Sequence, residues 1–224
     1  MVKWDGLTEV VLFSDFDGTI TLMDSTVELE KRYGNEQTRQ DERMFIAGEI
    51  TNRKAMIRHY QNMRLTEEMY YEVLRSIPLD PGFARFYAHV KELGGSLILL
   101  TANATIGVQC YLQEKGFDDI EVYGNRMEAP NGIINLYCAD EIADPLCETG
   151  SCAHCKSNKV SSAQKQGKKT IYIGDGLTDV CAAKYADVLF AKYKLADYCE
   201  EHKIPFVRFD SFDDICEYLF LIGE

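Results

Sequence analysis

The chain has 224 residues and carries 36 acidic against 24 basic side chains, so its formal net charge is −12. A hydrophobic content of 46% excludes a disordered chain, and the length suits one domain or one core with a smaller insert. The acidic balance argues against nucleic acid and against an anionic membrane as partners, because both bind to basic surfaces. A phosphorylated substrate would also be repelled unless the site supplies its own positive charge.

We expect no targeting or membrane segment in this sequence. No apolar stretch of signal-peptide length precedes Asp15, and the longest apolar runs, such as Leu97–Leu100 and Tyr218–Ile222, are too short to span a bilayer. We therefore expect a cytoplasmic protein that does not contact a membrane, while its oligomeric state stays open.

The first predicted strand, Glu9–Ser14, ends directly at the turn Asp15-Phe16-Asp17-Gly18-Thr19. Two carboxylates two residues apart cannot both ionise comfortably unless a cation lies between them. Gly18 permits a tight turn of the backbone. An acid in this position is often only a helix cap, so the turn taken alone is a weak indication of a site.

The segment from Leu22 to Ser76 contains no good strand and is charged, Met-rich and helical in pattern, with breaks at Gly34 and Gly48. Roughly 55 residues are too many for a loop in a compact domain. We expect a small helical cap over the core, and extra helices packed on the side of the sheet are the alternative. His59 in this segment, like His89 and His202 elsewhere, lies in a charged helical stretch and is expected at the surface.

A helix over Ala84–Leu93 leads to a second strand over Gly95–Thr101, which is followed by Ala102-Asn103 and a helix over Thr105–Lys115. The hydroxyl of Thr101 and the backbone N–H groups before this helix, including that of Ala102, suit a phosphate group. Thr101 could equally be a plain turn residue.

Three cysteines, Cys147, Cys152 and Cys155, are clustered just before a predicted helix over Lys156–Gln166. Their spacing, with His154 between the last two, could ligate Zn²⁺, and Cys138 could add a fourth ligand. Three thiols that pack an ordered loop are the alternative.

The third strand, Thr170–Ile173, ends at Gly174-Asp175-Gly176-Leu177-Thr178-Asp179, a second pair of acids in a Gly-rich turn. Further helices and strands then alternate to the end of the chain: Leu177–Lys184, Val188–Ala191, Leu195–Glu201 and Phe206–Phe209. Continuous apolar strands between helices predict an α/β fold with a doubly wound parallel sheet. Ligands of such sheets bind at the carboxyl ends of the strands, and oxygen donors gathered there favour Mg²⁺.

In this order, Asp15–Thr19 (DFDGT), Thr101, a lysine before the last motif and Gly174–Asp179 (GDGLTD) resemble the four motifs of the haloacid dehalogenase (HAD) superfamily of aspartyl phosphatases. The insert resembles the helical cap of the phosphoserine-phosphatase-like branch. The resemblance implies a Rossmann-like core over residues 1–21 and 77–224 and a cap over residues 22–76. It also implies a Mg²⁺-dependent phosphoric monoester hydrolase that acts on a small phosphorylated metabolite. A phosphotransferase of the same fold and a non-enzymatic phospho-sensing module are the alternatives.

The resemblance also implies a role for each motif residue. Asp15 would be the nucleophile that forms an aspartyl-phosphate, and Asp17 would be the general acid and base. Asp15, the backbone carbonyl of Asp17 and Asp175 would hold Mg²⁺, and Asp179 would support that site or add a ligand. Phosphate oxygens would be bound by three further residues: Thr101, Ala102 and Lys156. Lys159 is the alternative lysine, but Lys156 directly follows a cysteine, as in similar sequences.

Two subgroups of the superfamily share markers with this chain. Cys147–Lys156 (CETGSCAHCK) resembles a segment of both the methylthio-ketopentenyl-phosphate phosphatases and the phosphoethanolamine/phosphocholine phosphatases. Ala186–Ala191 (ADVLFA) and Leu195–Phe209 (LADYCEEHKIPFVRF) resemble the first group, whereas Thr101–Val108 (TANATIGV) resembles the second. Phosphoserine is a less favoured substrate, because Asp24 stands where its phosphatase has a glutamate and Ile57 stands where it has an arginine.

Overall fold

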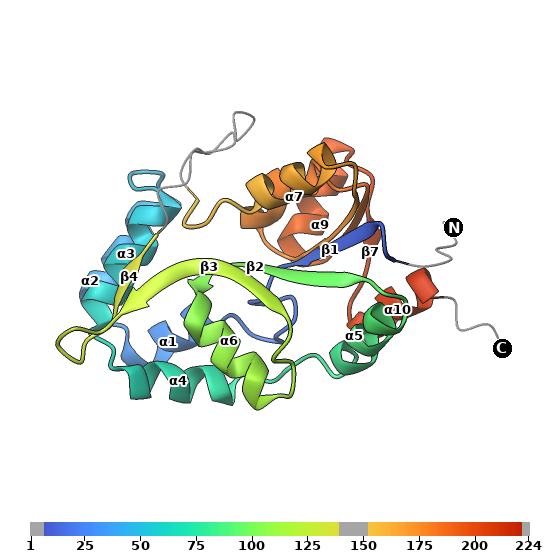
Figure 1. Ribbon diagram of the computed structural model, residues 1–224. Coiled ribbons are helices and arrows are strands. Elements are labelled where there is room, and N and C mark those ends of the chain that lie inside the picture. Colours follow the sequence, from blue (N-terminus) through green and yellow to red (C-terminus); the bar gives the residue numbers. More distant parts are fainter. Residues whose placement is uncertain (1–6, 139–151, 221–224) are drawn as a thin grey trace. The chain divides into compact units, whose positions relative to one another are not determined.

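The computed structural model describes residues 7–138 and 152–220, which form two compact units (Figure 1). Of these residues, 7–22, 79–99 and 156–220 belong to unit 1, and 23–78, 100–138 and 152–155 belong to unit 2. Nearly all of the predicted cap therefore lies in unit 2, together with a later part of the chain.

The strands form a seven-stranded sheet of order β4-β3-β2-β1-β5-β6-β7. Strand β2 (Ser96–Ala104) begins in unit 1 and ends in unit 2. Within unit 1, β2, β1, β5, β6 and β7 pair in parallel, which confirms the predicted α/β class. Their bounds are β1 Val10–Ser14, β5 Lys169–Gly174, β6 Val188–Ala191 and β7 Val207–Arg208.

Helices cover both faces of the unit 1 strands because these strands are apolar on both sides. In Figure 1, α7 and α9 lie on one side of these strands, and α5 and α10 lie on the other. Helices α5 and α10 meet through aromatic rings, with Phe212 centred 5.2 Å from Phe83 and 4.9 Å from Phe86. The unit 1 helices are α5 Phe83–Glu92, α7 Lys156–Lys165, η1 Leu177–Asp179, α8 Val180–Ala183, α9 Tyr193–His202 and α10 Phe212–Phe220.

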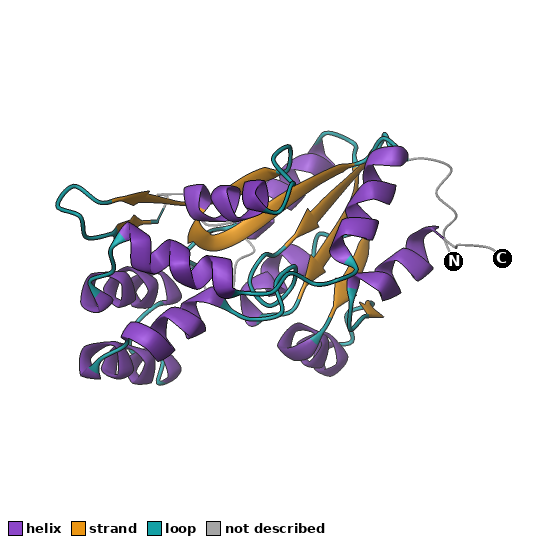
Figure 2. Cartoon of the chain, turned by 90° about the horizontal axis from the view of Figure 1, so that it is seen from below, coloured by secondary structure: helices purple, strands orange, loops and turns teal. Residues whose placement is uncertain are grey.

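Unit 2 contains the four helices of the predicted insert. Figure 2 shows all helices of the chain in purple and all strands in orange. Each insert helix begins at a polar side chain that accepts a hydrogen bond from the backbone of its first turn, which explains where the helices start. These caps are Asp24 for α1 (Ser25–Tyr33), Asn35 for α2 (Glu36–Ile46), Thr51 for α3 (Asn52–Met63) and Thr66 for α4 (Glu67–Ser76).

The rest of unit 2 is built on the end of β2. Helix α6 (Thr105–Glu114) follows this end directly and packs against β3 (Glu121–Glu128). Strand β4 (Asn135–Tyr137) pairs antiparallel with β3. In the described part of the chain, no helix is both long and apolar enough to cross a membrane.

Candidate active site

Three carboxylates meet in unit 1 at the carboxyl ends of β1 and β5. Ser14 pairs in parallel with Ile173, so the residues that follow these two strands emerge at the same edge of the sheet. Asp15 follows β1, whereas Asp175 and Asp179 follow β5. Each of the three offers an oxygen within 4.8 Å of the other two. The structure thus brings together three of the predicted acids.

A buried lysine lies among these acids. Lys156, the first residue of α7, places its Nζ atom 2.8 Å from Oδ1 of Asp15 and 2.7 Å from Oδ1 of Asp179. Its side chain is only 2% exposed. Lys159, the alternative one turn further along α7, is half-buried. Lys156 is therefore positioned to contact any group that Asp15 binds.

Asp179 is held by a full set of hydrogen-bond donors. Its Oδ1 accepts the hydroxyl of Tyr172 at 2.6 Å in addition to Lys156. Its Oδ2 accepts the backbone N–H groups of Asp175 at 3.1 Å and Gly176 at 3.0 Å. Asp179 consequently fixes both the turn after β5 and the direction of the lysine.

Asp15 and Asp175 each keep one oxygen without a hydrogen bond to the residues that the structure describes. Oδ1 of Asp15 accepts the N–H of Phe16 at 2.7 Å as well as Lys156, and Oδ1 of Asp175 accepts the hydroxyl of Thr19 at 2.7 Å. Their Oδ2 atoms have no such partner. Gly18 has a φ of +74° and lies so close that an added Cβ would be 2.7 Å from Oδ2 of Asp175. Two carboxylate oxygens are thus left for a ligand.

The protonation of the cluster follows from burial and from mutual repulsion. Burial, followed by the charge of Asp179, raises the pKa of Asp15 well above its usual value, although Lys156 opposes this shift. Burial and the charge of Asp179 likewise raise the pKa of Asp175 to about 6. For Lys156 burial acts to lower the pKa, but the charges of Asp15 and Asp179 outweigh it and raise the pKa above its ordinary value. One ammonium group among three carboxylates leaves room for a further positive charge.

The other predicted site residues fall in different places. Asp17 lies half-buried in the turn after β1, whereas Thr101 and Ala102 lie at the end of β2 and belong to unit 2. Cys152 is half-buried and Cys155 is buried, also in unit 2. Cys147 lies outside the described residues, so the zinc site stays a prediction.

The end of β2 is organised by Asn103, which is 1% exposed. Its Oδ1 accepts the hydroxyls of Tyr60 at 3.2 Å and Tyr70 at 2.5 Å, and its Nδ2 donates to the hydroxyl of Ser25 at 2.6 Å. Its backbone N–H donates to Oγ1 of Thr101 at 3.0 Å. Asn103 thereby connects three helices of the insert to the predicted phosphate-binding threonine, a role that its place in the sequence did not reveal.

Sequence reasoning also missed Lys192, a second buried lysine next to the cluster. Lys192 is 2% exposed, and its Nζ donates to the carbonyl of Thr19 at 3.3 Å and lies 5.0 Å from the ring centre of Phe209. Burial lowers the pKa of Lys192, against the charge of Asp175. Its position in the sequence could have indicated a place near the site, because Lys192 directly follows the apolar run Val188–Ala191 and so lies at the end of another strand.

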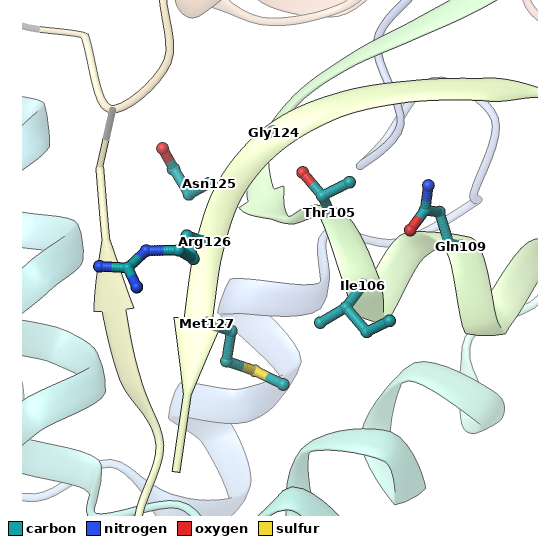
Figure 3. Close-up of a pocket in the computed structure, with 7 residues that line it drawn as sticks. All are labelled: Thr105, Ile106, Gln109, Gly124, Asn125, Arg126 and Met127. Atoms are coloured by element: carbon teal, nitrogen blue, oxygen red, sulfur yellow. The ribbon is translucent and has the colours of Figure 1, made fainter. Parts of the chain in front are cut away.

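A pocket of about 320 Å³ lies within unit 2, between the first turn of α6 and β3 (Figure 3). Thr105, Ile106 and Gln109 of α6 face Gly124–Met127 of β3 across it. The guanidinium of Arg126 is centred 4.5 Å from the ring of Tyr137, so this cation turns toward β4. Apart from Arg126, the pocket is lined by amide, hydroxyl and apolar groups.

Comparison with known proteins gives this geometry a context. The family model described as Putative Phosphatase matches residues 10–206. A 2-hydroxy-3-keto-5-methylthiopentenyl-1-phosphate phosphatase of Microcystis aeruginosa is 26% identical over 94% of this chain and 98% of its own length. Pdp3-interacting factor 1 of Schizosaccharomyces pombe is 31% identical over 92% of this chain and 93% of its own length.

Solved structures agree on the fold. A phosphoserine phosphatase determined as a phospho-aspartyl intermediate analogue is similar with a TM-score of 0.69 at 16% identity, over 95% of this chain and 99% of that one. These matches confirm the resemblance drawn from the motifs. The chain belongs to the Putative Phosphatase family and is a phosphatase of the haloacid dehalogenase superfamily.

Proposed function

We propose that this phosphatase hydrolyses a small phosphorylated metabolite through an aspartyl-phosphate on Asp15, with Mg²⁺ as cofactor. The observation that carries the proposal is the environment of Asp15. One oxygen is fixed by Lys156 and by the N–H of Phe16, while the other has no hydrogen bond to a described residue. A carboxylate held in this way presents one oxygen to an incoming phosphorus atom.

The donor set of the cluster fits Mg²⁺, because Asp15, Asp175 and Asp179 offer only carboxylate oxygens. Asp15 and Asp175, with the backbone carbonyl of Asp17, would hold the ion. Asp179 lies within reach and, with its four donors, would steady the site. When bound, the ion would supply positive charge that offsets the repulsion between the carboxylates and the phosphate.

The chemistry that follows uses residues of the chain at each step. A carboxylate oxygen of Asp15 forms a bond to phosphorus, the bond from phosphorus to the substrate oxygen breaks, and Asp17 gives that oxygen a proton. Asp17 then takes a proton from water, which bonds to phosphorus and displaces Asp15, so that inorganic phosphate leaves. Lys156 and Thr101 would stabilise the charge on the phosphoryl oxygens.

The residues at the positions expected to recognise an amino acid favour a phosphorylated metabolite other than phosphoserine as the substrate. Asp24 uses its carboxylate to accept the N–H of Val27 at 3.0 Å, as the cap of α1. Arg58 pairs with Asp41 at 2.7 Å. An acid and an arginine that could have recognised an amino acid are thus engaged elsewhere. The similarity to the methylthiopentenyl-phosphate phosphatase makes that phosphate ester the first compound to test, and phosphocholine the second.

The test is phosphate release by the purified protein from a panel of phosphorylated metabolites and from p-nitrophenyl phosphate. The panel includes 2-hydroxy-3-keto-5-methylthiopentenyl-1-phosphate, phosphocholine, phosphoethanolamine, phosphoserine and pyridoxal phosphate. We expect turnover with Mg²⁺, none with EDTA, and none in Asp15→Asn. The exposed Asp197→Asn on α9 is the matched control and should keep full activity. Turnover that persists in Asp15→Asn would exclude Asp15 as the nucleophile.

A further inference from the structure

A second group of metal-ligating side chains lies inside unit 2, among the helices of the insert. It consists of Glu30 on α1, Glu42 on α2 and His59 on α3. One carboxylate oxygen of each glutamate and one ring nitrogen of His59 all lie within 4.8 Å of one another. Helix α3 packs against both α1 and α2, so three separate helices direct these side chains to one place.

His59 is buried, and the expectation that it lies at the surface is wrong. It is 4% exposed because it lies on the same face of α3 as Met56 and Met63, three residues before it and four after it, which are also buried. Neither ring nitrogen makes a hydrogen bond to a described residue, and Nε2 is fully buried. A buried nitrogen without a partner is unfavourable, so this position calls for a ligand.

The two glutamates also lack partners among the residues that the structure describes. Both are half-buried, and neither side chain makes a hydrogen bond or an ion pair there. Other acids of the same helices are paired, such as Glu28 with Lys31 at 2.6 Å and Asp41 with Arg58 at 2.7 Å. Two like charges close to each other, without a cation, are unfavourable.

We propose that Glu30, Glu42 and His59 bind a divalent transition-metal ion that joins α1, α2 and α3, and that Zn²⁺ is the ion they fit. A nitrogen and two carboxylate oxygens form a mixed donor set that suits zinc, whereas Mg²⁺ prefers oxygen ligands alone. Bonds of about 2.1 Å at tetrahedral angles place the ligand atoms roughly 3.4 Å apart. Rotation of the flexible glutamate side chains brings the atoms from their present separation to that distance. The fourth position would hold water.

This site differs from the acid cluster of unit 1 in its ligand atoms and in the effect that a bound ion would have. The acid cluster contains only oxygen donors and lies at strand ends, where substrate chemistry takes place. The three ligands in unit 2 lie on three successive helices, α1, α2 and α3, so an ion bound to them cross-links this part of the insert. Because such an ion binds only the folded chain, it should raise the melting temperature.

The test is zinc binding by the full chain, measured by calorimetry and by zinc content after dialysis in a large excess of Mg²⁺. Glu42→Gln and His59→Gln remove one ligand each, and Glu42→Gln changes the shape of the side chain least. Exposed residues of the same types supply the matched controls Glu68→Gln on α4 and His202→Gln on α9. Because every variant is compared with the wild type, zinc bound by cysteines or by unit 1 adds the same background to each sample.

We expect the wild type and both controls to bind one more equivalent of Zn²⁺ than Glu42→Gln and His59→Gln, or to bind that equivalent at least about tenfold more tightly. We also expect zinc to raise the melting temperature of the wild type and the controls more than that of these two variants. Circular dichroism establishes that each variant is folded. Equal zinc binding by the wild type and a folded Glu42→Gln overturns the proposal, and so does a wild type that binds no zinc.

Discussion

Replacing Lys156 by methionine tests whether this lysine holds the acid cluster together. The change keeps most of the side-chain volume and removes the ammonium group. Lys156 makes ion pairs of 2.8 Å with Asp15 and 2.7 Å with Asp179, and the side chains of these acids are 9% and 0% exposed. Breaking a buried pair by removing one partner costs about 3–5 kcal/mol, since the remaining charge stays buried.

Most of this loss of stability should come from Asp15, because it is left with fewer hydrogen-bond donors than Asp179. After the substitution Asp179 keeps the Tyr172 hydroxyl and two backbone N–H groups, whereas Asp15 keeps only the N–H of Phe16. Because the pKa of Lys156 is raised above its ordinary value, the lysine is charged in both the folded and the unfolded chain at neutral pH. We therefore expect a loss of about 3–4 kcal/mol in the free energy of unfolding at neutral pH, shrinking in acid, where the carboxylates bind protons.

The assay is urea unfolding followed by circular dichroism, with EDTA present so that bound metal does not contribute. The exposed Lys165→Met on the same helix is the control and should change stability by less than about 0.5 kcal/mol. Adding Asp15→Asn to Lys156→Met should restore part of the loss, because it removes the unpaired charge. A loss below about 1 kcal/mol for Lys156→Met at neutral pH would refute the reasoning.

Four further outcomes are expected. Folding raises the pKa of Asp175 from 3.8 to about 6, so without bound metal, in EDTA, the folded chain binds the proton of this carboxyl group more tightly than the unfolded chain does. Stability should therefore fall by up to about 3 kcal/mol as the pH rises from about 4 to about 6, and melting curves of Asp175→Asn should lack this part of the fall. Gly18→Ala should weaken Mg²⁺ binding in calorimetry, whereas Gly48→Ala, with a φ of +72° but no neighbour within 4 Å of the added Cβ, should not. Tyr172→Phe should lower the free energy of unfolding by about 1–2 kcal/mol in urea melts. Asn103→Ala should lower it by at least about 3 kcal/mol, because buried hydroxyl groups lose their partner.

The parts of the fold that the sequence predicts well are those with a strong local signal. Strands β1, β5 and β6 are continuous apolar runs, and the acids that follow two of them indicate a site because they occur together, at the carboxyl ends of strands in one predicted sheet. Parallel pairing then brings these acids together, so much of the cluster around Asp15 could be anticipated from one chain.

The elements that were missed lack such a signal. Strand β3 has the sequence EVYGNRME, which contains few apolar residues, and its Gly124 lies so close to β2 that an added Cβ would be 2.6 Å from the carbonyl of Asn103. Its identity as a strand therefore depends on pairing with its neighbours in the sheet, β2 and β4, rather than on its own apolar pattern. Helix α10 was not predicted, because its short amphipathic pattern lies at the end of the chain among acids. His59 and Lys192 are buried polar residues whose surroundings come from other elements, which a local pattern cannot reveal.

The hydrogen bonds of Asn103 limit which segments can be exchanged between this protein and its relatives in chimeric proteins. Ser25, Tyr60 and Tyr70 come from three helices of the insert, yet all three bond to one amide at the end of β2. An insert transplanted from a relative, or deleted, would leave that amide buried without its partners. Recombination of specificity between such phosphatases should therefore succeed only when the strand end around Thr101 is inherited with the helices, as a single block of the chain.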